Sequence, residues 1–352
     1  MPTNPLNLYT SQALQAELAK QERDKPGQLS LDDHHLGQLL GLVSEEKGPR
    51  SPLPGIQRQK LTDPAFINLL VDKGWLVAAG KDGKLHPTAH SRRAVLGLLK
   101  PNTSIQLVLG SLTELSISAL YSAEGYRKDT FVIYMHKKEE NRTILHPALS
   151  PADLSDALLA HLLIGPREGL GFELALSQRP MLAYLAVLDL VYTRRMEARL
   201  RAEIMPQLNF SAADLLARFA EIRLGEDITW LSALLPYLFP YLRADLPEAV
   251  VAGLLAGLER EGLLTPMPDG RYQPNDFTVA LSEALLPTFA YASLAVVNAE
   301  ESGLHLAFLV GQFVNLVIKA DEVEGDLLVS MTGMDQKQFS KILFEIGLPE
   351  QG

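Results

Sequence analysis

The chain has 352 residues, of which 47% are hydrophobic, and it carries a formal net charge of −10. This length can supply hydrophobic cores for two domains, and the absence of cysteine excludes disulfides, thiolate metal sites and cysteine nucleophiles. The charge is uneven, about +1 over residues 1–165 and about −11 over residues 166–352, so the chain as a whole repels phosphate backbones.

The first residues read MPTNPLNLYTSQALQAELAK and lack the basic and then apolar pattern of a signal peptide. We therefore expect a cytoplasmic protein with a helical N-terminal extension. The cluster from Asp32 to His35 contains no histidine and carboxylate pair at i, i+4 that would complete a metal-ligand face. A helix start with an aspartate cap explains it better, and we expect no metal site.

The segment DPAFINLLVDKGWLVAAGKDGKLHP predicts a helix that ends at Gly74, followed by a hairpin that turns at Asp82-Gly83. A helix ending at Leu98-Leu99 comes next, and then two strand-like runs, SIQLVLG and FVIYMH. The pattern S/T-x-x-D at Ser150 to Asp153 then predicts a capped helix start. Together these elements describe one α+β unit.

A second copy of this order follows. After the boundary GPREGLGFE at residues 165–173 comes a long helix with apolar residues at helical spacing, including MLAYLAVLDLVY, which is too short to span a membrane. Gly262 then matches Gly74, and Asp269-Gly270 matches the first turn, at offsets of 187 or 188 residues. Thr332 to Asp335 matches the capping pattern at Ser150, and the run from Phe210 resembles the run from Leu29.

The predicted fold is therefore α+β, with two pseudo-symmetric halves, each a winged-helix-like helix and hairpin piece plus an antiparallel meander flanked by helices. Residues 1–165 form the first repeat with its N-terminal helical extension. Residues 166–352 form the second repeat, preceded by a helical segment at about residues 175–245.

One aromatic segment lies in a part of the chain that the duplication does not explain. The run TWLSALLPYLFPYL contains four aromatic residues interrupted by prolines, which prevent a continuous helix. Packing between the halves is one explanation. The other is a partner-binding surface, because tyrosine and tryptophan beside apolar pockets are typical interface anchors. The candidate partner-binding residues are Trp230, Tyr237, Phe239 and Tyr241.

Nucleic-acid binding is the alternative. A winged helix reads DNA through Arg, Lys, Asn or Gln side chains on a helix in the major groove, and neither candidate helix is rich in them. The alternative depends on the basic residues from Lys47 to Lys100, above all Arg92 and Arg93. The sequence favours a protein partner over nucleic acid. It contains no catalytic or cofactor-binding motif, so we expect no catalytic residues, no cofactor and no enzyme activity.

The layout resembles the EspG family of type VII secretion chaperones. The resemblance is clearest over residues 60–165, in DPAFINLLVDKGWLVAAGKDGKLHP, LLKPNTSIQLVL and LSPADLSDALLAHLL, and weaker over residues 245–350. It implies a cytosolic, non-enzymatic adaptor or chaperone that holds a helical client through its sheet and helices. The N-terminal extension and the helical segment at about residues 175–245 depart from the family pattern.

Overall fold

The computed structural model describes residues 27–79, 84–111, 115–123, 131–137, 142–162, 170–204, 207–225, 230–239, 246–298, 303–323 and 326–346. Four predicted features lie outside these ranges: Tyr241, the Asp82-Gly83 turn, the N-terminal residues 1–26 and residues 165–169 of the boundary. Within the described part of the chain, no helix is long and apolar enough to cross a membrane.

The elements of the first half are β1 (Leu29–Leu31), α2 (Asp33–Leu40), α3 (Pro64–Asp72), β2 (Leu76–Ala79), β3 (Lys84–Pro87), α4 (Ala89–Leu99), β4 (Thr103–Ser111), β5 (Leu115–Ser122), β6 (Phe131–Lys137), β7 (Arg142–Leu149) and α5 (Pro151–Leu162). Those of the second half are β8 (Phe172–Ser177), α6 (Gln178–Leu200), α7 (Ala212–Gly225), α8 (Leu231–Leu238), α9 (Glu248–Arg260), β9 (Leu264–Pro266), β10 (Tyr272–Pro274), α10 (Asp276–Leu285), β11 (Ala290–Asn298), β12 (Gly303–Val310), β13 (Asn315–Val323), β14 (Asp326–Met334) and α11 (Gln336–Ile346).

Ten strands form one antiparallel sheet in the order β1-β7-β6-β5-β4-β11-β12-β13-β14-β8. The two halves meet where β4 pairs with β11, and the pairing runs from Thr103 opposite Asn298 to Ser111 opposite Ala290. Each half also carries a separate two-stranded hairpin, β2 with β3 and β9 with β10. The predicted mixture of helices and antiparallel sheet is confirmed.

The same backbone hydrogen bonds end the helix before each hairpin. Gly74 and Gly262 both have φ of 71°, in the left-handed region that glycine adopts without strain. In the first half, the amide of Trp75 donates to the carbonyl of Leu70 at 2.7 Å, and in the second half that of Leu263 donates to Leu258 at 3.0 Å. Both predicted glycine helix ends are therefore confirmed. Gly270, in the second predicted turn, also has positive φ.

The predicted capping patterns have different outcomes. Ser150 and Asp153 form a capping box at α5, because each side chain accepts from the other's backbone amide, at 2.8 and 3.1 Å. The predicted box at Thr332 is wrong, since Thr332 lies inside β14. The box at α11 is formed by Asp335 and Gln338 instead. Pairing with β13 extends β14 to Met334, so residues 332–334 of the predicted cap belong to the strand.

A second correction concerns the upstream match between the runs from Leu29 and Phe210. β1 lies at one edge of the sheet beside β7, and the strand in the corresponding place at the other edge is β8, beside β14. α6 follows β8 directly, as α2 follows β1. The run from Phe210 leads instead into α7. α7 and α8 lie between α6 and α9, whereas in the first half no helix lies between α2 and α3.

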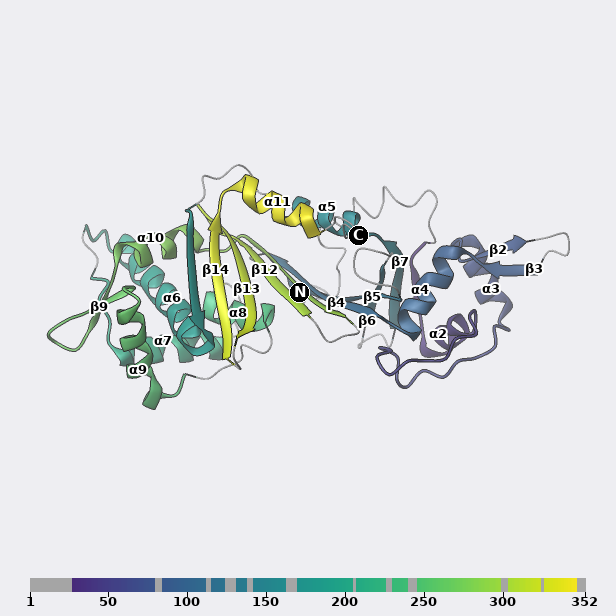
Figure 1. Cartoon of the computed structure of the whole chain (residues 1–352), viewed down its shortest axis with the longest axis horizontal. Coiled ribbons are helices and arrows are strands. Elements are labelled where there is room, and N and C mark those ends of the chain that lie inside the picture. The colour runs from purple at the N-terminus through teal and green to yellow at the C-terminus, as the bar shows by residue number, and fades with distance from the viewer. Residues whose placement is uncertain are drawn as a thin grey trace.

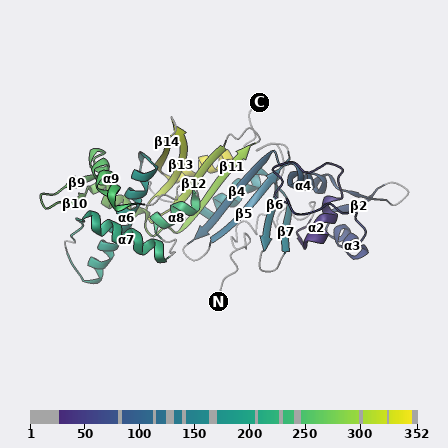
Figure 2. The same ribbon diagram turned by 90° about the horizontal axis from the view of Figure 1, so that it is seen from below.

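Helices cover the two faces of the sheet unequally (Figures 1 and 2). α5 and α11 pack together on one face, over a core that includes Leu107, Leu294 and Phe339. On the other face, α2 and α4 cover the first half and α6 and α8 cover the second. Figure 2 shows β4 between these two helical regions, and α4 also packs against β5.

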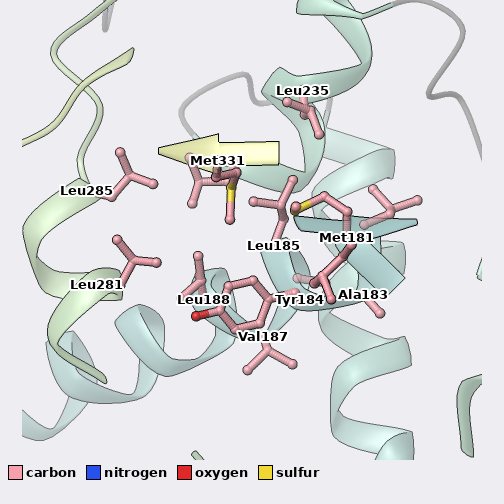
Figure 3. Packing of buried hydrophobic residues seen from close by; sticks show 14 of the residues in the cluster. Met181, Ala183, Tyr184, Leu185, Val187, Leu188, Leu235, Leu281, Leu285 and Met331 are labelled. Atoms are coloured by element: carbon pink, nitrogen blue, oxygen red, sulfur yellow. The ribbon is translucent and has the colours of Figure 1, made fainter. Parts of the chain in front are cut away.

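The long helix α6 is the centre of the largest core. Met181 to Val191 are all buried, so the helix is surrounded on every side, as expected for a run that is apolar all round. Figure 3 shows Tyr184, Leu185 and Leu188 of α6 facing Leu281 of α10 and Met331 of β14. The helix predicted from the sequence in this region is confirmed.

Candidate functional site

The aromatic segment forms the short helix α8 and its two flanks. The prediction that prolines prevent a continuous helix is only partly right, since α8 runs through Pro236 and ends at Leu238. Trp230 is its N-cap residue but provides no side-chain hydrogen bond to the first turn. The exposed amides at the start of a helix need an acceptor, so another element has to supply it.

Asp189 of α6 supplies that acceptor. Its two carboxylate oxygens accept the backbone amides of Leu231 and Ser232, each at 2.9 Å, and the hydroxyl of Ser232 at 2.6 Å. Burial raises the pKa of Asp189 to about 6, although the bonds from Ser232 and Leu231 and the charge of Arg218 act to lower it. A lone acid within MLAYLAVLDLVY was the sequence signal for this buried cap.

The other end of α8 is bound to the sheet. The carbonyl of Leu238 accepts a hydrogen bond from the hydroxyl of Ser293 in β11 at 2.8 Å, and it lies 2.7 Å from Nε2 of His305 in β12. Burial lowers the pKa of His305 to about 4, so the ring is neutral at pH 7. The ring of Phe239 lies 4.2 Å from that of His305. α8 is thus attached at both ends.

The candidate residues of this segment differ in burial. Phe239 is fully buried in the core, so the interface explanation is corrected for this residue: its ring packs inside the fold and is not open to a partner. Trp230 and Tyr237 are only half-buried. The ring of Trp230 lies 4.1 Å from the guanidinium carbon of Arg218 and 6.3 Å from the ring of Tyr192, which holds the indole in place.

The open part of the sheet begins next to α8. In β11, Ser293 lies under α8, and Ala295 and Val297 follow on the same face because side chains alternate along a strand. Val297 is 43% exposed, and Gln106 of β4, opposite Ala295, is exposed as well. The accessible surface therefore consists of α8, with Trp230 and Tyr237, and of the strip of sheet beside it. Both ends of α8 are fixed by hydrogen bonds. No sequence pattern indicated this strip, because it depends on strand pairing between the halves.

The residues of the nucleic-acid alternative lie on α4. Arg92 is exposed and forms an ion pair with Glu45 at 3.3 Å, and Arg93 is exposed on the same helix. Two other basic residues of the patch have structural roles. Lys47 donates to the carbonyls of Leu53 and Ile56, and Arg58 donates to those of Leu40, at the end of α2, and Ser44. Fewer cations of this patch are therefore available for phosphate than the sequence count indicates.

The cluster at Asp32 is a pair of helix caps. Asp32 accepts the amide of His35 at the start of α2, and Asp63 accepts the amide of Ala65 at the start of α3. The ring of His35 lies between the two carboxylates, at 2.9 and 3.1 Å. The predicted aspartate cap is confirmed. The part of the chain that the structure describes contains no group of three or more potential metal ligands.

An open hollow of about 810 Å³ lies at the end of α6, beside the start of α7 and the second hairpin. Its charged side chains are largely paired with one another. Arg194 is 3.1 Å from Asp214, and Arg271 contacts Asp269 at 2.6 Å and Oδ1 of Asn209 at 3.3 Å. These contacts join α6, α7 and the hairpin, and they give the hollow a structural role.

No protein-family model matches the sequence, and no curated protein matches it. Among solved structures, the fold is similar to the type VII secretion system chaperone EspG5 of Mycobacterium tuberculosis, solved in complex with a PE25–PPE41 dimer. The match covers 92% of this chain and 97% of that chain, with a TM-score of 0.40 and 10% sequence identity. At this level of similarity, nothing about partners or activity follows for the present chain.

Proposed function

We propose that this chain is a non-enzymatic adaptor or chaperone that holds another protein through α8 and the open sheet face beside it. The observation that carries the proposal is the position of Trp230 and Tyr237. Both are half-exposed aromatic residues on a helix whose two ends are fixed by Asp189 and by Ser293 and His305. Aromatic residues held in this way bind a partner at little cost in conformational entropy.

The perturbed titratable groups near α8 support a non-enzymatic function. Asp189 and His305 have the shifted pKa values that catalytic residues often have. Each of them, however, is hydrogen-bonded to one end of α8, and both have a complete structural role there. The family resemblance of residues 60–165 implies a helical client and a cytosolic location, and both belong to the proposal.

The proposal also includes the origin of the fold. We interpret the two halves as pseudo-symmetric copies, each with a winged-helix-like helix and hairpin piece that serves as scaffold, divided near residue 165. Two observations support this interpretation. The strands follow the same order from the centre of the sheet to each edge, and the helices before the two hairpins end with the same hydrogen bonds, at Gly74 and Gly262. In the second copy, α7 and α8 are additions, and α8 carries the proposed binding residues.

The test is recovery of a partner from the native host with tagged wild-type protein and matched variants. We expect a stoichiometric partner with wild-type protein that is lost with Trp230→Ala and Tyr237→Ala, and kept with Phe344→Ala, which removes an exposed aromatic residue from α11. The purified partner should then bind at least about tenfold more weakly to each site variant, a difference of about 1.4 kcal/mol. Equal recovery and equal affinity for all variants would exclude this site.

A further inference from the structure

The hairpins of the two halves differ in what lies along their outer edge. In the second half, the amide and carbonyl of Phe210 exchange hydrogen bonds with those of Tyr272 in β10, at 2.9 and 2.8 Å. Phe210 is fully buried, and its ring lies 6.3 Å from that of Tyr272. The extended segment at Phe210 therefore pairs with the outer edge of β10 through a single antiparallel β-bridge.

The counterpart of Tyr272 in the first half is Leu85. The hairpins have the same register, because Leu76 opposes Pro87 as Leu264 opposes Pro274. Leu85 thus takes the place of Tyr272, two residues before the proline, and its amide and carbonyl point outward as those of Tyr272 do. Its side chain is 42% exposed, and no described segment forms a backbone hydrogen bond with it.

The difference has a clear structural cause. In the second half, α6 has 23 residues and is followed by the Phe210 segment and α7, which pack on α9 and the hairpin. In the first half, α2 has 8 residues, and an irregular segment leads from it to α3. Ile67 of α3 is accordingly half-buried, whereas Leu255 at the matching position of α9 is fully buried.

We infer that the outer edge of β3 at Leu85 binds an extended segment of a partner protein, antiparallel to β3, with an aromatic residue against Leu85. Addition of a strand to an open hairpin edge gives main-chain hydrogen bonds, and the side chain beside it gives specificity. This adds a second contact surface to the proposed adaptor function and rests on that function for its biological role.

The net charge of this part of the chain defines the partner further. Described residues 27–100 contain nine Lys and Arg against six Asp and Glu, so an acidic segment is favoured. The second half shows a matching detail. Arg271 donates to the side chain of Asn209, the residue before Phe210, and Lys84 occupies the place of Arg271 in the first half. The expected partner segment therefore has an Asp or Asn immediately before its aromatic residue.

The chain itself provides the probe, a labelled peptide with the sequence of residues 207–217, QLNFSAADLLA, which has a net charge of −1. Fluorescence anisotropy with the full-length protein should show saturable binding. We expect an affinity at least about tenfold lower for Leu85→Glu, and for the peptide with alanine in place of its phenylalanine. Phe344→Glu, at another exposed apolar position, should bind as wild-type protein does.

Three results would overturn the inference: no saturable binding of the peptide, equal binding by Leu85→Glu, or a self-association of the free protein that is lost in Leu85→Glu. The last result, measured by sedimentation, would assign the edge to a second copy of the chain. Trp230→Ala should bind the peptide normally. Failure at the β3 edge is therefore distinguishable from failure of the proposed α8 site.

Discussion

Leu107 of β4 lies directly opposite Leu294 of β11, and each is the fifth residue of its nine-residue strand. The sheet continues in the same order on both sides of this pair, through three more meander strands to a short edge strand that precedes a helix. The arrangement is what a pseudo-twofold axis through the Leu107 and Leu294 pair would produce. It places the join between the halves inside a continuous sheet.

The first prediction follows from that axis. An experimental structure should superpose the halves with Gly74 on Gly262, Leu107 on Leu294 and Ser150 on Asp335, because these positions share their place in strand order and helix capping. The measurement is a Cα superposition of the two halves. A different connectivity in either half would contradict the duplication.

The second prediction concerns a glycine under an aromatic ring. Gly110 lies opposite Tyr291, and a Cβ added at Gly110 would come within 2.2 Å of the tyrosine ring. We expect Gly110→Ala to cost about 1–3 kcal/mol in the free energy of unfolding, as overpacking does. Gly253 of α9 has open space around it, so Gly253→Ala should instead gain about 0.5–1 kcal/mol. Urea denaturation measures both, and equal effects would argue against the tight contact.

The third prediction separates packing from binding in the aromatic segment. Phe239→Ala should destabilise the protein by about 3–5 kcal/mol, because it empties a fully buried position. Trp230→Ala and Tyr237→Ala remove half-exposed side chains and should reduce stability less, while weakening partner binding by about 1.4 kcal/mol or more. Thermal unfolding and titration calorimetry provide the two measurements. A large stability loss for Tyr237→Ala would show that this residue belongs to the core.

The fourth prediction concerns pH. Asp189 has a pKa raised from 3.8 to about 6 in the folded protein, so its contribution to stability is full below pH 4 and is lost as the pH rises through 6. His305 has a pKa lowered from 6.5 to about 4, so its contribution is full above pH 6.5 and is lost as the pH falls towards 4. The two effects oppose each other across the same range.

Single substitutions should reveal each effect. Asp189→Asn should lose stability more steeply than wild-type protein between pH 6.5 and 4, because only the histidine effect remains. His305→Gln should instead gain stability relative to wild-type protein as the pH falls over this range, since only the carboxyl effect remains. Urea denaturation at several pH values tests this, and parallel profiles for the three proteins would contradict the assigned pKa shifts.

The fifth prediction concerns nucleic acid. We expect only weak, non-specific DNA binding at physiological salt, because the chain is acidic and Lys47 and Arg58 are hydrogen-bonded to backbone carbonyls. Fluorescence anisotropy with labelled duplex DNA measures this. Sequence-dependent binding at micromolar concentration or tighter, abolished by Arg92→Ala and Arg93→Ala, would support the regulator alternative instead.

The sequence by itself determined the local elements. Gly74 and Gly262 ended their helices as predicted, and the Ser150 box formed, because helix ends depend on neighbouring residues and on φ values that few residues adopt. The predicted capping box at Thr332 did not form, because its outcome depends on strand pairing and not on local residues alone. Whether a residue caps a helix or extends a strand there depends on the partner strand β13, which is distant from the capping pattern.

Only the tertiary structure decided the site. Phe239 and Trp230 belong to one aromatic run, yet one is buried and the other half-exposed, because His305 and Asp189 reach α8 from a strand and a helix that are remote in sequence. Leu85 and Tyr272 likewise hold equivalent places in two similar hairpins, and only the packing of the Phe210 segment distinguishes them. Local pattern fixes helices, turns and strands through backbone sterics and nearby hydrogen bonds. Exposure depends on which distant segment covers a surface, and that is set by the packing of the whole chain.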